Sequence, residues 1–114
     1  MGSERLIAVS DAGPLIHLTE IDSLSLLSIA DQLHIPQAVW QETVGQGRVS
    51  QADLSVLRNL RSHTLPSGKV ERFIQEHGLT ELHAGERECL YLCRSLGALT
   101  LLTDDLAVRK LPGV

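Results

Sequence analysis

The chain has 114 residues, 43% of them hydrophobic, and a formal net charge of −4. This length fits a single domain over residues 1–114, and the apolar content supports a hydrophobic core, which excludes a disordered chain. The sequence holds one Phe, one Trp and one Tyr, so a sheet that stacks RNA bases on several aromatic rings is not expected. No apolar run has the length of a membrane span or of a signal peptide, and we expect a cytoplasmic protein without a membrane partner.

Along the chain, short apolar runs alternate with segments of helical periodicity. The runs that predict strands are, in order, 6–9, 33–35, 63–65 and 98–103. The patterns that predict helices lie at 15–18, 24–30, 36–45, 54–60, 70–74, 84–96 and 106–110. Strands that alternate with helices predict an α/β fold with a mainly parallel sheet covered by helices.

Several local signals mark where these helices begin and end. Asp22 or Ser23 is a candidate N-cap for the 24–30 helix, and Ser50 followed by Asp53 resembles a capping box. Gly78 and Gly97 are predicted to end the helices that precede them.

The two cysteines, Cys89 and Cys93, lie four residues apart within a predicted helix. A disulfide framework needs more cysteines and a different spacing. We therefore expect two reduced, half-buried thiols, and we consider a metal or redox role less favoured.

Acidic residues stand at the ends of two predicted strands, at Asp11 and at the Asp104–Asp105 pair. Ligands of open parallel sheets bind beyond the carboxyl ends of the strands, so these side chains converge if the strands are neighbours. Glu42 follows in the 36–45 helix, and Glu86 lies in the first turn of the 84–96 helix, where the helix dipole favours a negative charge.

A cluster of such carboxylates needs a cation, because like charges at close range repel one another. Oxygen ligands without paired His or Cys suit Mg²⁺ or Mn²⁺, and such an ion supports phosphodiester hydrolysis. Binding of a metal by these five acids would leave the rest of the chain close to neutral, so the net charge neither supports nor excludes an RNA partner.

Each acid also has a purely structural interpretation. Asp11 and Asp104 are both suited to cap the helix that follows, and for either residue alone we give that role the same weight as a functional one. Glu86 could serve the helix dipole only, and Glu42 could be a solvated helix position. Four further acids are interpreted as surface charges: Glu71, Glu76, Glu81 and Glu88. His83 lies close to Glu86 in sequence, and a surface position is the favoured interpretation for it.

Four segments, in order, resemble the PIN-domain family, and in particular its VapC-like toxin branch. They are VSDAGPLIHL (9–18), IPQAVWQE (35–42), AGERECLYLCRSLG (84–97) and ALTLLTDDLAVRK (98–110). Each motif is loose, but together they cover nearly the whole chain. The resemblance implies a three-layer α/β/α fold. Because family members usually continue with a further strand and helix, we expect this fold to be shortened at its C-terminal end.

The resemblance further implies a ribonuclease that uses Mg²⁺ or Mn²⁺ to hydrolyse single-stranded RNA. It also implies a homodimer and, in toxin-like members, neutralisation by a partner antitoxin. Carried over by motif, the catalytic acids are Asp11, Glu42, Glu86, Asp104 and Asp105. Asp11, Glu86 and Asp105 are the expected metal ligands, since Thr103 aligns Asp105 with the family's Thr-x-Asp.

Two other functions remain open from the sequence. One is a catalytically inactive PIN-like module that acts through protein association, which the short C-terminal end suggests. The other is a receiver-like phosphoacceptor domain, which also carries aspartates at strand ends. A receiver needs a central aspartate after a middle strand, and the 33–35 strand leads into Pro36 instead, so this interpretation ranks last.

Overall fold

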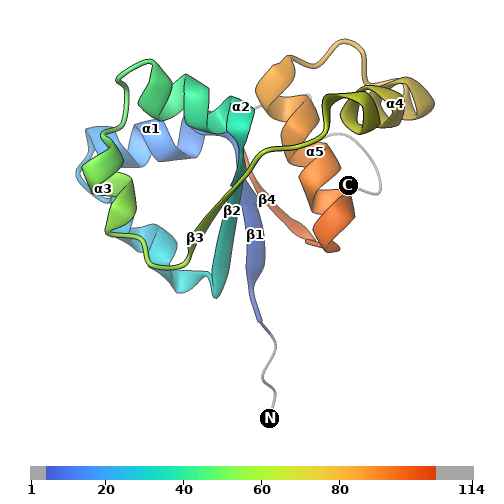
Figure 1. The fold of residues 1–114 in the computed structure, drawn as a ribbon. Coiled ribbons are helices and arrows are strands. Elements are labelled where there is room, and N and C mark those ends of the chain that lie inside the picture. The colour runs from blue at the N-terminus through green and yellow to red at the C-terminus, as the bar shows by residue number, and fades with distance from the viewer. Residues whose placement is uncertain (1–4, 105–114) are drawn as a thin grey trace.

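The computed structural model describes residues 5–104, which form a β-sheet with helices on both faces (Figure 1). The strands are β1 (Ile7–Ser10), β2 (Gln32–Pro36), β3 (Leu60–His63) and β4 (Thr100–Leu102). The α-helices are α1 (Ala12–Glu20), α2 (Gln37–Trp40), α3 (Gln51–Ser55), α4 (Ser67–His77) and α5 (Ala84–Leu96). A 3₁₀ helix, η1 (Leu24–Ile29), precedes β2, and a π-helical turn, η2 (Gln41–Gly45), continues α2.

The sheet is parallel throughout and has the strand order β3-β2-β1-β4. β1 therefore lies inside the sheet, where Val9 pairs with His34 on one side and with Leu101 on the other. In Figure 1, α1 and α3 cover one face of the sheet, while α4 and α5 cover the other. This arrangement is the predicted three-layer α/β/α fold, and it brings the ends of β1 and β4 to one edge.

The core is built almost entirely from aliphatic side chains, as the scarcity of aromatic residues requires. Val9, Leu33 and Ile35 on the inner strands are fully buried, and Leu15 of α1 and Leu92 of α5 pack against them from opposite faces. β1 reads as an apolar run because both faces of a parallel sheet are covered by helices, while in β2 the buried His34 lies between Leu33 and Ile35. Because these residues must stay buried, the positions of the strand ends are fixed. Asp11 directly follows β1, so its position is fixed with them.

The elements predicted around residue 60 are wrong in detail. The apolar stripe at Leu54, Leu57 and Leu60 predicts one helix, but α3 ends at Ser55 and Leu60 begins β3. Apolar residues three positions apart also fit a turn that brings the chain back to the core. Leu57 lies in such a turn and is buried. Asn59 stabilises this turn, since its Nδ2 donates to the backbone oxygens of Leu27 and Ala30 at 3.0 and 2.9 Å. The strand predicted at 63–65 therefore begins three residues earlier.

The helix signals are more accurate. The Oγ of Ser50 accepts a hydrogen bond from the Asp53 backbone N at 3.0 Å, as in a capping box. Gly78 and Gly97 end α4 and α5 with φ of 64° and 66°, a left-handed conformation that favours glycine. Ser23 occupies the N-cap position of η1 but makes no side-chain capping bond. The helix predicted at 106–110 lies outside the described residues.

Two further expectations concern thiols and membranes. Both cysteines are free, and they are fully buried rather than half-buried, with exposed fractions of 1% for Cys89 and 5% for Cys93. Burial raises the pKa of both thiols, that of Cys93 to about 11. Within residues 5–104, none of the helices is long and apolar enough to cross a membrane.

Candidate active site

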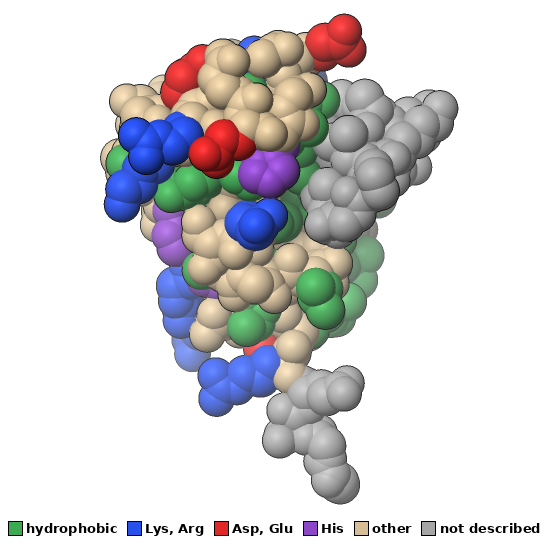
Figure 2. All heavy atoms as spheres, turned by 90° about the vertical axis from the view of Figure 1, so that its right-hand side faces the viewer, with side chains coloured by type: hydrophobic (Ala, Val, Ile, Leu, Met, Phe, Trp, Pro, Cys, Tyr) green, Lys and Arg blue, Asp and Glu red, His purple; other side chains and the backbone are tan. Residues whose placement is uncertain are grey.

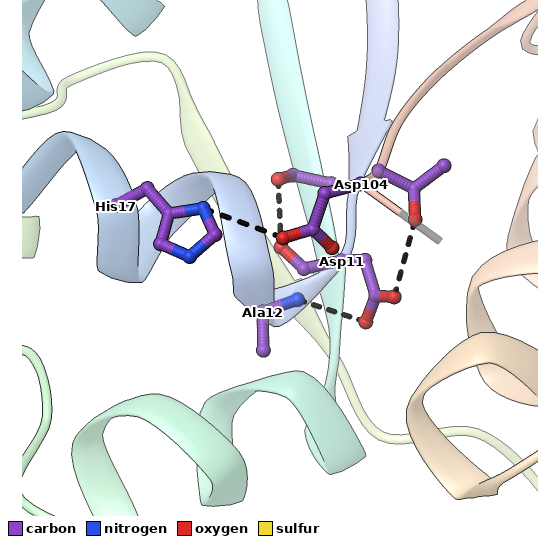
Figure 3. Close-up of polar contacts among 6 residues, drawn as sticks. Asp11, Ala12, His17 and Asp104 are labelled. Carbon is purple, nitrogen blue, oxygen red and sulfur yellow. Dashed lines mark hydrogen bonds and ion pairs between the residues drawn. The ribbon is translucent and has the colours of Figure 1, made fainter. Parts of the chain in front are cut away.

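Asp11 lies directly beyond β1, at the edge where β1 and β4 end side by side. Its backbone N donates to the Leu102 oxygen at 2.9 Å, so the sheet pairing fixes its position. The side chain is only 5% exposed. Its Oδ1 accepts from the Ala12 backbone N at 2.8 Å, and its Oδ2 accepts from Thr103 Oγ1 at 3.5 Å (Figure 3). Asp11 is therefore the N-cap of α1 and also a buried carboxylate at the strand ends.

Glu42 reaches the same place from the π-helical turn η2. Gly85, in the first turn of α5, marks the point of approach: a Cβ there would collide with Glu42 Oε1 and would lie 3.2 Å from Asp11 Oδ1. The absence of a side chain at Gly85 thus lets two carboxylates, more than thirty residues apart in the sequence, converge on the start of α5. Burial raises the pKa of Glu42, and the negative charge of Asp11 raises it further. His83 opposes this shift.

Glu86 follows Gly85 in the first turn of α5 and is 3% exposed. Its Oε1 is in contact with Nε2 of His83, the N-cap residue of the same helix. His83 is exposed, as predicted, but its ring contacts Glu86, and its charge also acts on Glu42. A buried carboxylate at a helix N-terminus gains from the helix dipole, so the structural and functional interpretations of Glu86 both remain available.

Asp104 lies on the other side of Asp11, over the first turn of α1. A Cβ on Gly13 would overlap its carboxylate, and its Oδ2 is 3.3 Å from His17 Nδ1 (Figure 3). Asp104 is exposed, and so is His17, so this contact contributes little to stability. Asp105, the expected family equivalent, lies outside the described residues.

Glu88 is predicted to be a surface charge, and this is wrong. It is half-buried, and its Oε1 accepts a hydrogen bond from the Ala38 backbone N at 3.0 Å. Glu88 thereby ties α5 to the start of α2, the helix that leads into Glu42. The signal is present in the helical periodicity, because Glu88 shares a face of α5 with Gly85, Cys89 and Leu92.

The donor set for a metal is only partly assembled among the described residues. Within residues 5–104, no three side chains of His, Cys, Asp or Glu come together closely enough to hold a metal ion. The pair that does converge, Asp11 with Glu42, offers only carboxylate oxygens, which fit a hard divalent cation such as Mg²⁺ or Mn²⁺. The raised pKa of Glu42 is also what an uncompensated carboxylate pair produces. The chemistry of the donors therefore fits a metal, and Asp11 and Glu42 are the assembled part of the set.

The basic side chains suited to contact phosphate groups are dispersed. Arg48, Arg58 and Arg61 are exposed, and Arg61 Nη1 donates to two backbone oxygens, those of Arg58 and Leu60, at 3.0 and 2.9 Å. Figure 2 shows the face that carries α4 and α5, where basic side chains lie at separate places between acidic and neutral ones. Arg109 and Lys110 lie outside the described residues.

Comparison with known proteins identifies a family. A family model described as a PIN domain matches residues 7–112, nearly the whole chain. Neither a curated protein nor a solved structure matches. The family model spans all four segments that carry the resemblance found in the sequence, and both the parallel sheet and the acidic residues at the strand ends lie within it.

Proposed function

The chain belongs to the PIN-domain family, and on this premise we propose that it is a metal-dependent endoribonuclease that hydrolyses single-stranded RNA. PIN domains are typically nucleases, which gives a hydrolase of nucleic-acid phosphodiesters as the coarse activity. The observation that carries the proposal is the convergence of Asp11 and Glu42 at Gly85, because two neighbouring carboxylates repel each other and a bound cation removes that repulsion.

The proposed roles combine the resemblance of the motifs with the positions of the acids that the structure describes. Asp11, Glu86 and Asp105 would hold Mg²⁺ or Mn²⁺, with Glu42 as a further oxygen donor beside Asp11, and Asp104 would complete the catalytic acids. The metal supplies Lewis-acid stabilisation and an activated water when bound. Asp11 is fixed by its hydrogen bonds to Ala12 and Thr103, so it presents its carboxylate in one orientation. Burial and the charge of Asp11 raise the pKa of Glu42, and a cation bound beside it would lower that pKa again.

The experiment is a cleavage assay on a fluorescent single-stranded RNA with Mn²⁺ or Mg²⁺. Asp11→Asn keeps the shape of the side chain and its capping oxygen but removes the charge, and we expect cleavage to fall at least about a hundredfold. The matched control is Glu76→Gln, which removes a carboxylate from the exposed surface of α4 and should leave cleavage unchanged. Equal activity of Asp11→Asn and wild type would remove the proposed site.

We further propose that the protein acts as the toxin of a toxin–antitoxin pair and that it forms a homodimer. Both properties are inferred from the resemblance of the motifs to the VapC-like branch. The supporting observation is a group of exposed apolar side chains on η1 and after α3, with exposed fractions of 59% for Leu26, 79% for Ile29 and 71% for Val56. Sedimentation analysis of the purified chain tests the dimer, and a monomer at micromolar concentration would contradict it.

The alternative is a catalytically inactive PIN-like module that acts through protein association. It is favoured by the same exposed apolar side chains and by the lack of a complete metal site within residues 5–104. The two functions differ in their response to Mn²⁺. A nuclease site should be stabilised by about 2.7 kcal/mol at a hundredfold excess of the metal over its Kd, whereas an inactive module should melt at the same temperature with and without it.

A further inference from the structure

A small hollow lies at the same edge of the sheet as the acids, beyond the carboxyl ends of β2 and β3. Its volume is about 240 Å³. Its lining combines two flat rings with uncharged hydrogen-bonding groups: Gln37, Trp40, Gln41, Ser62, His63 and Thr64. Because none of these described lining residues is an acid, a lysine or an arginine, the hollow suits a planar, uncharged, polar group and does not suit a phosphate.

The His63 ring is held in place by a short chain of hydrogen bonds. Its Nε2 is 2.7 Å from Nδ1 of His34, and Nε2 of His34 is 2.9 Å from the Gln32 side-chain oxygen. An amide oxygen only accepts, so His34 carries its proton on Nε2 and accepts from His63 through Nδ1. The remaining nitrogen of the His63 ring, Nδ1, is then an acceptor. Burial lowers the pKa of both histidines, so both rings are neutral at neutral pH.

We propose that this hollow binds one unpaired nucleobase of the RNA substrate, an inference that rests on the proposed function. Proteins recognise single-stranded RNA by stacking splayed bases on Trp or His rings and by bonding the base edges to polar side chains. Trp40 and His63 supply the rings. Gln37 and Gln41 each offer an amide, which donates and accepts at once and therefore matches the edge of a base. The volume is below that of a site for a drug-sized molecule, as a single base requires.

The position of the hollow relative to the acids fits one bound strand. β3 is two strands away from β1, so His63 and Asp11 lie roughly 10 Å apart along the edge, given the usual spacing of neighbouring strands. Trp40 immediately precedes η2, and Glu42 lies two residues further along the same helical segment. A base held at Trp40 would therefore set which phosphodiester of the strand reaches Asp11 and Glu42.

Trp40 is the only tryptophan of the chain, so its fluorescence reports on the hollow directly. The experiment titrates the full chain with short single-stranded oligoribonucleotides in EDTA, where metal-dependent cleavage does not occur. We expect saturable quenching of Trp40. An oligonucleotide of the same length and charge that lacks its bases should leave the fluorescence unchanged. Equal quenching by both would show that the backbone binds and would overturn the proposal.

A double variant, called the rim variant below, tests the polar residues that line the hollow. It leaves Trp40 and the hydrophobic core unchanged. Gln37→Ala with Thr64→Ala removes two exposed side chains, and the loss of two hydrogen bonds predicts about tenfold weaker binding. The control Gln51→Ala removes an exposed amide from α3 and should bind as wild type does. Equal affinity of the double variant and wild type would overturn the proposal, and so would RNA that binds without quenching Trp40.

The nuclease proposal and the base-binding proposal can be contradicted independently of each other. If Asp11→Asn abolishes cleavage but the rim variant binds normally, the nuclease stands and the base site falls. If the bases quench Trp40 and the rim variant weakens this, but no cleavage occurs with Mn²⁺, the base site stands without the nuclease. In an active enzyme the rim variant should raise KM and leave kcat nearly unchanged. If Trp40 fluorescence does not respond to RNA but is quenched by a purified protein partner, the hollow serves protein association instead.

Discussion

The first turns of α1 and α5 are built alike, but the acidic side chain that packs on each of them is held in place to a different degree. In each helix the second residue is a glycine, Gly13 or Gly85, and in each an acidic side chain from elsewhere in the chain occupies the space of the missing Cβ. At Gly85 the neighbour is Glu42, half-buried and next to the buried Asp11. At Gly13 the neighbour is Asp104, which is exposed.

The N-caps of the two helices differ as well. Asp11 caps α1 with its own side chain, whereas His83 makes no capping hydrogen bond to α5 and instead contacts Glu86. At α1, Asp11 stabilises the helix as its N-cap. At α5 the acids crowd around the helix start and are paired with a histidine. This comparison indicates that the part of the site at α5 is arranged at a cost to stability, which is typical of a functional site.

The largest effect is expected from Gly85→Ala. The new methyl group would push Glu42 away from Asp11, and a displacement of about 1 Å at a catalytic site can lower the rate a hundredfold. Because Glu42 is a flexible side chain, the fold should tolerate the change, and alanine in a helix should add up to about 1 kcal/mol of stability. RNA cleavage and thermal melting measure the two effects. Unchanged cleavage would mean that the approach of Glu42 to Asp11 has no role.

The second-largest effect is expected from variants that separate the two roles of Asp11, as the N-cap of α1 and as a carboxylate of the candidate site. Asp11→Asn retains an oxygen that can accept from the Ala12 backbone, whereas Asp11→Ala does not. Both variants remove the charge beside Glu42, so their difference reports the hydrogen bonds of the side chain, chiefly the 2.8 Å capping bond, and should be about 1 kcal/mol in the free energy of unfolding. Urea denaturation measures it. Equal stability would show that the capping bond contributes nothing, while loss of cleavage in both would still assign the carboxylate to the chemistry.

A smaller effect is expected from Glu42→Gln without metal. The raised pKa of Glu42 means that the folded state holds its proton more tightly than the unfolded state, so stability should fall as the pH rises above the ordinary value of 4.5. The variant lacks this ionisation and should be more stable than wild type at pH 7, by about 0.5 kcal/mol for a partly exposed group. Melting curves between pH 4 and pH 8 measure this, with Glu76→Gln as the control. The same pH dependence in the two variants would contradict the raised pKa of Glu42, whose first cause is burial and whose second is the charge of Asp11.

The smallest effect on cleavage is expected from Gly13→Ala, the counterpart of Gly85→Ala. Asp104 is exposed and can move aside, so the loss of activity should not exceed about threefold, or ~0.6 kcal/mol. The gain in helix stability should match that of Gly85→Ala, since both glycines occupy the same position in a first turn. A loss as large as that of Gly85→Ala would place Asp104 at the centre of the site and erase the difference between the two helix starts.

Much of the fold could be predicted from the sequence because burial leaves a clear pattern. β1 is an apolar run that ends at Ser10, β2 places Leu33 and Ile35 before Pro36, and α5 combines helical periodicity with a glycine stop, so their predicted positions are correct within one or two residues. The prediction for residues 54–60 failed because a spacing of three residues suits both a helix and a turn toward the core. The tie between Asn59 and the end of η1 decides between them, and such a contact has no local signature.

The site was predictable in part for the same reason. Residues that follow neighbouring parallel strands share an edge, so the strand pattern predicts that Asp11 and Asp104 lie close together if their strands are neighbours, and β1 and β4 are neighbours in the sheet. The approach of Glu42 depends instead on Gly85 and on the bond from Glu88 to Ala38, which joins residues fifty positions apart. These contacts are tertiary, and local sequence patterns do not contain them. The base-binding hollow was missed because its lining residues are ordinary polar ones that come from two separate segments.

The strand order has a consequence for the time at which the enzyme becomes active during its synthesis. β1 leaves the ribosome first, but its second neighbour in the sheet is β4, whose pairing joins Ala8 to Thr100. The helices need only local contacts, and the β1–β2 pair joins residues 25 positions apart, so both can form before β4 is made. The edge that gathers Asp11 and Asp104 closes only after β4 has emerged. The strand-end acids of the candidate site are therefore brought together only after the other three strands of the sheet have been synthesised.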